Sequence, residues 1–78
     1  MSLPPLPAQP TPGRYRHYKG QEYRVIGLAR HSETLEPLVV YQALYGERGL
    51  WVRPAAMFVE TVQLADGPVP RFARIADE

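Results

Sequence analysis

The sequence contains no cysteine, so the protein has no disulfide bond and no thiolate that could bind metal or act as a nucleophile. Small secreted domains usually depend on disulfides for their stability. No apolar run approaches the roughly 20 residues that cross a bilayer, and the first residues have neither the basic segment nor the apolar run of a signal peptide. We therefore expect a cytoplasmic protein that does not contact membranes.

Motifs for catalysis and for cofactor binding are also scarce. His17 and His31 fall on different expected strands, with no carboxylate beside them at metal-ligand spacing, whereas a zinc site needs three or four ligands. The glycines at residues 46–49 lack the lysine and helix of a phosphate-binding loop. We therefore expect no metal, no cofactor and no enzymatic activity. A small enzyme with a loop site around His31 and Glu33 is the least favoured alternative.

Proline is concentrated at the start of the chain. Five of the nine prolines lie within residues 1–12, which carry no charged side chain. Proline lacks an amide donor and fixes φ, so this segment forms neither a helix nor a sheet ladder. We predict a disordered, partly polyproline-II tail over residues 1–12, followed by a single domain over residues 13–76. The sequence leaves open whether the tail binds anything.

The rest of the chain consists of short segments rich in β-branched and aromatic residues, separated by turn residues. Gly27 marks a bulge or bend inside one of these segments. Residues 46–49 predict a hairpin turn, and residues 54–57 predict one helical or 3-10 turn that begins with proline and carries Met57 as a core plug. The expected strands cover residues 13–19, 22–31, 38–45, 50–53, 58–64 and 69–75.

Five or six short antiparallel strands, without a helix of ordinary length, predict an all-β domain. Closing a sheet of this size into a small barrel protects its edges from pairing with other chains. The order of hairpin turn, short strand, proline-led helical turn and short strand is typical of the end of SH3-like barrels. We therefore predict a small SH3-like barrel, and this analogy of fold implies no particular function.

The formal net charge is only +1, but the charges are unevenly distributed. Residues 1–30 carry five basic side chains and one acidic, which gives +4, whereas residues 31–78 carry four basic and seven acidic, which gives −3. Basic residues interleaved with aromatic ones suit a nucleic-acid surface. Strands of opposite charge that simply pair in the sheet produce the same pattern. Under the nucleic-acid interpretation, the phosphate contacts are Arg14, Arg16, Lys19, Arg24 and Arg30.

Trp51 and Arg53 share one face of an expected strand, because side chains alternate along a strand. If Leu50 and Val52 point inward, the Trp51–Arg53 pair points outward, where it suits a protein partner or the stacking of nucleic-acid bases. In the alternative interpretation, Trp51 covers the open end of the barrel and Arg53 pairs with an acidic residue. The pattern does not decide between an aromatic platform and an aromatic core.

Five segments together resemble a family of short bacterial proteins known only as a domain of unknown function. The resemblance covers nearly all of residues 13–72, and the proline-rich tail is extra. It implies a small bacterial protein, SH3-like in fold, and it implies no reaction or ligand. The segments are Tyr-Arg-His-Tyr-Lys-Gly at residues 15–20, Ala-Arg-His-Ser-Glu-Thr at 29–34, Val-Val-Tyr at 39–41, Leu-Tyr-Gly-Glu at 44–47, and Trp-Val-Arg-Pro at 51–54 with Met57 and Phe58.

The leading hypothesis from the sequence is a non-enzymatic module that binds a protein or a peptide, with nucleic acid as the alternative partner. The sequence does not predict the oligomeric state. The hypothesis requires the candidate side chains to lie together on an exposed surface. These candidates are polar and aromatic residues that a barrel core does not require: His17, His31, Glu33, Tyr41, Trp51 and Arg53.

Overall fold

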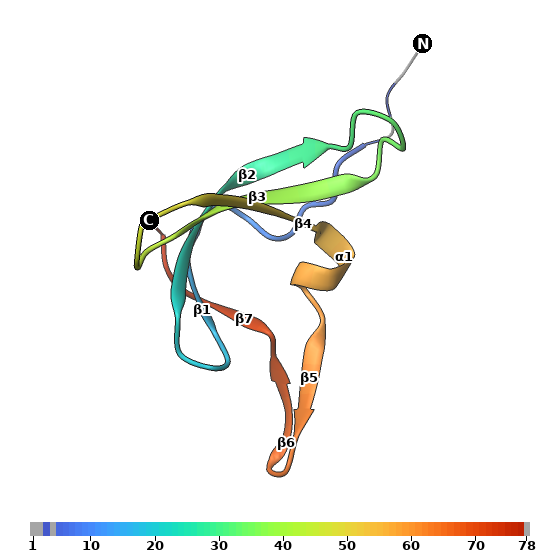
Figure 1. The fold of residues 1–78 in the computed structure, drawn as a ribbon. Helices are drawn as coiled ribbons and strands as arrows, with labels where there is room; N and C mark the ends of the chain where they lie inside the picture. Colours follow the sequence, from blue (N-terminus) through green and yellow to red (C-terminus); the bar gives the residue numbers. More distant parts are fainter. Residues whose placement is uncertain (1–2, 4, 78) are drawn as a thin grey trace.

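The computed structural model describes residue 3 and residues 5–77, and nearly all of its regular structure is β (Figure 1). The predicted all-β class is confirmed. The described residues form seven strands rather than the expected five or six, because Arg71 divides the expected last strand in two. No helix among the described residues is long and apolar enough to cross a membrane. The elements are β1 (Gly13–His17), β2 (Glu22–Arg30), β3 (Pro37–Ala43), β4 (Leu50–Pro54), α1 (Ala55–Phe58), β5 (Thr61–Leu64), β6 (Gly67–Pro70) and β7 (Phe72–Ala76).

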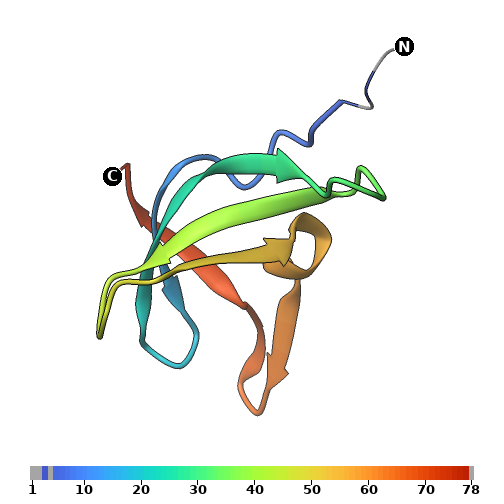
Figure 2. The ribbon, with the colours of Figure 1, turned by 45° about the horizontal axis from the view of Figure 1, so that its top comes forward.

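Five strands form one curled antiparallel sheet in the order β4-β3-β2-β1-β7, and β5 pairs with β6 in a separate hairpin. The sheet bends around a concave side, and α1 with the β5–β6 hairpin connects β4 to β7 (Figures 1 and 2). Within the part of the chain that the structure describes, β4 forms a ladder with β3 alone. One edge of β4 is therefore unpaired.

The curl of the sheet is linked to an irregularity in β2. The register between β2 and β3 shifts between Val25 and Gly27, which confirms the predicted bulge near Gly27. Ile26 lies within this bulge and is half exposed. A bulge bends its strand and increases the local twist, so β2 can follow the curve of the sheet around the core.

The core on the concave side consists mainly of aromatic residues. Tyr15, Tyr41, Phe58 and Phe72 are each at most 7% exposed. The rings of Phe58 and Phe72 are stacked with centroids 4.1 Å apart, and Tyr15 and Tyr41 each meet Phe58 edge-on at 5.5 Å. Offset and edge-to-face contacts are the favourable arrangements for aromatic rings. Phe58 and Phe72 therefore join α1 and β7 to the inner face of the sheet.

The predicted helical turn after β4 is present, but the prediction that Met57 plugs the core is wrong. Met57 is 47% exposed, whereas Phe58 is 1% exposed. The helix begins at Ala55, and residues three apart share a helix face. Ala55 and Phe58 therefore face the core together, and Met57 faces away from it.

The end of the proline-rich segment contacts the domain. Pro10 is buried, and the Tyr15 hydroxyl donates a hydrogen bond of 2.8 Å to the carbonyl of Thr11. The Arg74 guanidinium donates one of 3.0 Å to the carbonyl of Pro12. The described residues of this segment form neither helix nor strand, as their proline content predicts.

Gly13 occupies a position where β1 and β7 approach closely. Its φ is 153°, and a Cβ there would lie 2.7 Å from the Ala76 carbonyl oxygen. We expect Gly13→Ala to lower the free energy of unfolding by about 2–4 kcal/mol, because overpacking adds to backbone strain. Gly20→Ala is the control, since φ at Gly20 is 109° but a Cβ would meet nothing within 4 Å. Urea unfolding measures both losses, and equal losses would contradict the close approach.

Candidate functional site

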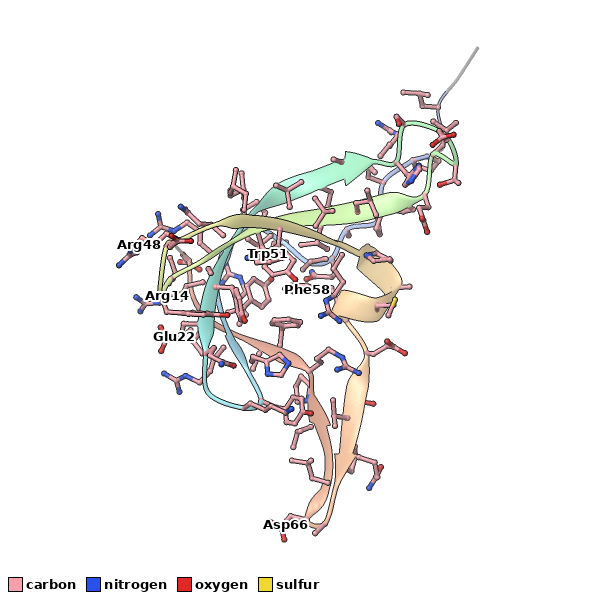
Figure 3. All side chains as sticks on the ribbon, viewed as in Figure 1. Arg14, Glu22, Arg48, Trp51, Phe58 and Asp66 are labelled. Carbon is pink, nitrogen blue, oxygen red and sulfur yellow. The ribbon has the colours of Figure 1, made fainter. Side chains whose placement is uncertain are left out.

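The register between β3 and β4 determines which way the candidate residues of β4 face. Trp51 pairs with Tyr41, and Arg53 pairs with Val39. Directly paired residues share one face of a sheet, and Tyr41 and Val39 are buried in the core. Trp51 and Arg53 therefore face the concave side, as Figure 3 shows for Trp51. The orientation considered from the sequence, with Trp51 and Arg53 outward, is reversed.

Although it faces the concave side, Trp51 is 58% exposed, because it lies on the edge strand rather than over the middle of the core. Leu50 and Val52 point to the other side of the sheet and are 65% and 59% exposed. Edge strands in natural proteins usually carry charges or are covered. β4 carries one charged residue, Arg53, but it also presents three consecutive exposed apolar residues along its unpaired edge.

The ladder pattern also shows which backbone groups of β4 are unpaired. β3 donates a hydrogen bond of 3.0 Å to the carbonyl of Gly49, at the hairpin end of the pair. Hydrogen-bonded pairs alternate along an antiparallel ladder, so Trp51 and Arg53 are the next residues of β4 to bond β3. The amides and carbonyls of Leu50 and Val52 therefore point away from β3, and no residue in the described ranges bonds them.

Basic side chains from three distant segments meet where β4 approaches β1 and β7. The guanidinium carbon of Arg53 lies 5.7 Å from the centroid of the Phe72 ring, and the imidazole of His17 meets the same ring edge-on at 5.0 Å. Lys19 and Arg71 lie beside the same site, because the Lys19 ammonium is 5.8 Å from the centroid of the Tyr18 ring and the Arg71 carbonyl accepts a hydrogen bond of 2.9 Å from the Tyr18 amide. We call His17, Lys19, Arg53 and Arg71 the basic rim.

Burial lowers the pKa of His17 below its ordinary value of 6.5, and the charges of Arg71, Lys19 and Arg53 lower it further. The Nδ1 atom of His17 accepts a hydrogen bond of 3.2 Å from the Lys19 amide, which also favours the neutral imidazole. The positive charge of the basic rim therefore comes from Lys19, Arg53 and Arg71, and not from His17.

No carboxylate among the described residues forms an ion pair with the basic rim. The ion pairs of the described ranges join Glu22 to two arginines of β1, and Arg74 to Asp77. The Nε atom of Arg71 is buried without a hydrogen-bond partner, an arrangement that costs about 1–3 kcal/mol. The basic rim therefore carries positive charge that no carboxylate among the described residues neutralises in an ion pair, which is a property of a surface that can receive an anion.

The lowered pKa of His17 predicts how stability depends on pH. The unfolded chain binds this proton more readily than the folded domain does, so stability is lost as the pH falls below about 6.5. We expect the free energy of unfolding to decline from about pH 7.5 to about pH 5.5, and to decline less in His17→Gln. Urea unfolding at stepped pH measures both slopes. Equal slopes in the two proteins would contradict the assignment to His17.

Two sequence-predicted site residues, His31 and Glu33, lie far from the basic rim. The nine-residue strand β2 separates their loop from the turn that follows His17 (Figure 1). A strand of this length spans about 26 Å. The Nδ1 atom of His31 accepts hydrogen bonds from the amides of Glu33 and Thr34, at 3.1 and 3.3 Å. These bonds stabilise the turn of the loop.

A cavity lies close to that loop, but His31 and Glu33 do not line it. The cavity has a volume of about 520 Å³, and it is lined by the proline-rich segment, α1, Glu36 and Pro37. No group of three or more side chains suited to a metal ion occurs among the described residues. Tyr41, the remaining candidate, is a core residue that is 7% exposed. Of the six candidates predicted from the sequence, the three that remain together beside the edge of β4 are therefore His17, Trp51 and Arg53.

The basic residues predicted for nucleic-acid binding do not form one surface. Lys19 belongs to the basic rim, and Arg30 ends β2 at the distant loop. Glu22 lies 3.8 Å from Arg14 and 2.9 Å from Arg16 and neutralises part of their charge; Figure 3 shows Glu22 and Arg14 outside the curve of the sheet. Three of the five lie on the outer face of β1 and β2, namely Arg14, Arg16 and Arg24.

Sequence reasoning missed Arg71 as a member of the basic rim and Phe72 as the buried ring over which Arg53 lies. The available signal was an arginine directly beside an aromatic residue in the expected last strand. That signal was weak, because neither residue indicates by itself that β7 pairs with the edge of β1 opposite to β2. Phe72 pairs with His17 in the ladder between β1 and β7, and this pairing brings Arg71 to the basic rim.

Comparison with known proteins agrees with the resemblance seen in the sequence. The profile of a family described as "Protein of unknown function (DUF1653)" matches residues 13–74, which include β4 and the basic rim. The structure is similar to the crystal structure of a DUF1653 protein from Bordetella bronchiseptica, with 46% sequence identity and a TM-score of 0.80. The alignment covers 87% of this chain and 90% of that chain. No curated protein matches the chain.

Proposed function

The chain belongs to the DUF1653 family of proteins of unknown function, and we propose that it is a non-enzymatic module that binds an extended segment of a partner protein. The segment lies along the unpaired edge of β4 and adds a strand to the sheet. One observation carries this proposal. The backbone groups of Leu50 and Val52 point away from β3, on a strand with three exposed apolar residues.

The first three residues of β4 have the composition of a strand that pairs with a partner, whereas its last two, Arg53 and Pro54, are residue types that protect an edge. Charges, proline and coverage by other elements are the usual protection of an edge strand, and Leu50, Trp51 and Val52 provide none of these. Pro54, which has no amide donor, closes one end of the strand, and the hairpin turn closes the other. The accessible edge therefore accommodates a segment of about four or five residues.

The two sides of the added strand would meet different surfaces. Its side chains next to Leu50 and Val52 would extend the outer face, where Val40 pairs with Val52. Its alternate side chains would lie beside Trp51 and Arg53 on the concave side. An exposed tryptophan beside an arginine is a frequent centre of binding energy in protein interfaces.

The same proposal includes the finer features of the fold and location. We assign the domain to the SH3-like barrels, because the helical turn α1 follows β4 and β7 returns to pair with β1. We place it in the cytoplasm, because its stability requires no disulfide. An enzyme at His31 is not favoured, because its Nδ1 atom bonds the backbone of its own loop.

A neutral peptide tests the proposal without any contribution from charge. The probe is an acetylated and amidated heptapeptide of alternating valine and asparagine, titrated into the ¹⁵N-labelled domain and followed by amide NMR. We expect the largest shifts at the amides of Leu50 and Val52. The proposal would be overturned if the largest shifts lay elsewhere in the domain, or if no amide shifted up to the solubility limit of the peptide.

Two controls test the alternatives to a partner peptide, which are a second copy of the chain and a nucleic acid. A dilution series without peptide detects a second copy of the chain, since self-pairing would shift the Leu50 and Val52 amides with protein concentration. A short single-stranded oligonucleotide at low and moderate salt detects the nucleic-acid alternative. Shifts at Arg14 and Arg24 that weaken steeply with salt would indicate phosphate binding and would favour that alternative.

A further inference from the structure

We propose that the basic rim selects the partner, so that the segment added to β4 alternates apolar and acidic residues and its carboxylates bind Arg53, Arg71 and Lys19. This inference rests on the proposed function, and it specifies the chemistry of the segment that the edge receives. Its basis is the position of the basic rim on the concave side of the same edge strand.

The geometry of an added strand brings its side chains to the basic rim. Side chains on one face of a strand repeat every second residue, about 6.6 Å apart. Trp51 and Arg53 have this spacing on β4 and face the concave side. The alternate residues of the partner therefore pass beside Arg53, while the residues between them meet the apolar outer face of Leu50 and Val52.

The arginines of the basic rim are held in place before any ligand arrives. The Arg53 guanidinium lies over the Phe72 ring, with its carbon 5.7 Å from the centroid. The Arg71 backbone is fixed on both sides, because its amide donates to the Glu60 carbonyl and its carbonyl accepts from the Tyr18 amide, each at 2.9 Å. Groups ordered in advance lose less entropy when they bind.

The charges of the basic rim favour carboxylates. An arginine guanidinium can donate two parallel hydrogen bonds to one carboxylate, and Arg53 and Arg71 both have this capacity. The nearest acidic residue along the hairpin, Glu60, bonds Arg71 through its backbone carbonyl, and it forms no ion pair with Arg71. No carboxylate among the described residues therefore competes with an incoming acidic side chain for an ion pair with Arg71.

The layout of the cations distinguishes an acidic peptide from a nucleic acid. Binding a single strand requires cations that follow a phosphate backbone over several nucleotides. The basic rim instead lies beside one short strand, and the outer face of that strand is apolar at Leu50 and Val52. A chain that offers acidic side chains on one face and apolar ones on the other complements both faces of β4.

A matched pair of peptides tests the inference on the whole chain. The first is the neutral valine–asparagine heptapeptide, and the second carries aspartate at each asparagine position, with both ends capped so that only the side chains differ in charge. We expect the aspartate peptide to bind about tenfold or more tightly at low salt, with this preference reduced at high salt. Both peptides should shift the Leu50 and Val52 amides.

Variants locate the source of the preference. In Arg53→Gln/Arg71→Gln most of the preference for the aspartate peptide should be lost, with the remainder due to Lys19, whereas Arg16→Gln, on the outer face of β1, should keep the preference. Equal affinities in the unmodified protein would overturn the inference and leave the proposed function intact, and that comparison needs no variant to fold. If neither peptide reaches the edge, the proposed function itself fails. Tighter binding of an oligonucleotide of equal charge at the basic rim would also overturn the inference.

Discussion

Replacing Phe58 with alanine is expected to lower the free energy of unfolding by about 3–5 kcal/mol. Phe58 is 1% exposed, and its ring is stacked on Phe72 and meets Tyr15 and Tyr41 edge-on. Truncation removes these contacts and leaves a cavity where α1 meets the sheet. Small domains have only about 5 kcal/mol of stability to lose, so a large part of the Phe58→Ala protein should be unfolded.

The neighbouring residue provides a matched control for this loss. Met57 belongs to the same helical turn but is 47% exposed, so Met57→Ala should change stability by less than about 1 kcal/mol. Phe58→Leu should lose less than Phe58→Ala and remain folded, which keeps the comparison measurable. Urea unfolding followed by the fluorescence of Trp51 gives all three values. Similar losses at Met57 and Phe58 would contradict the placement of Phe58 as the core residue of α1.

Replacing Val52 with proline is expected to weaken peptide binding by about tenfold or more while the domain stays folded. The Val52 amide points away from β3, so proline removes a donor that the fold does not use and the added strand does. Losing one such bond costs about 1–1.5 kcal/mol, which corresponds to about tenfold in affinity. Trp51, which precedes the new proline, is already extended in β4, the conformation that proline favours in the preceding residue.

Val52→Thr controls for the loss of the valine side chain, because threonine keeps the amide donor and a similar shape. NMR titration of both variants with the valine–asparagine peptide gives their dissociation constants, and the retained β3–β4 amide shifts report that the hairpin is intact. Binding by Val52→Pro as tight as by Val52→Thr would show that the partner does not bond this edge.

The positions of the strands were largely predictable, because the signals for them are local. The β-branched and aromatic run of β3, the glycine-bounded turn after it and the proline before α1 each determine structure within a few residues. The bulge near Gly27 was predicted for the same reason, since a glycine inside an apolar strand indicates a bend. The division of the expected last strand at Arg71 was not predictable, because it depends on the separate pairing of β6 and β7.

The directions of the side chains were less predictable. Alternation along a strand places Trp51 and Arg53 on one face, but only the pairing with Tyr41 and Val39 shows that this face is the concave one. The choice between Met57 and Phe58 depended on where α1 begins, and helix boundaries are uncertain by a residue or two. A shift of one residue exchanges the buried and exposed side chains of so short a helix.

The basic rim could not be predicted from local patterns at all. Lys19, Arg53 and Arg71 lie far apart in the sequence, and they meet because β1 pairs with β7 while β4 curls over the same side of the core. Of this cluster, His17 and Arg53 were sequence candidates for the peptide surface and Lys19 was one for the nucleic-acid alternative, whereas Arg71 was not selected. His31 and Glu33 were selected by residue type, and the structure places them in a loop that their own hydrogen bonds shape.

The most direct test of strand addition is the measurement of intermolecular nuclear Overhauser contacts between the ¹⁵N-labelled domain and the aspartate peptide. The expected result is contacts from the amide protons of Leu50 and Val52 to the backbone protons of the peptide, in the pattern of a β-ladder. Contacts of the peptide with the outer face around Arg14 and Arg24, with none to the β4 amides, would contradict the proposed function.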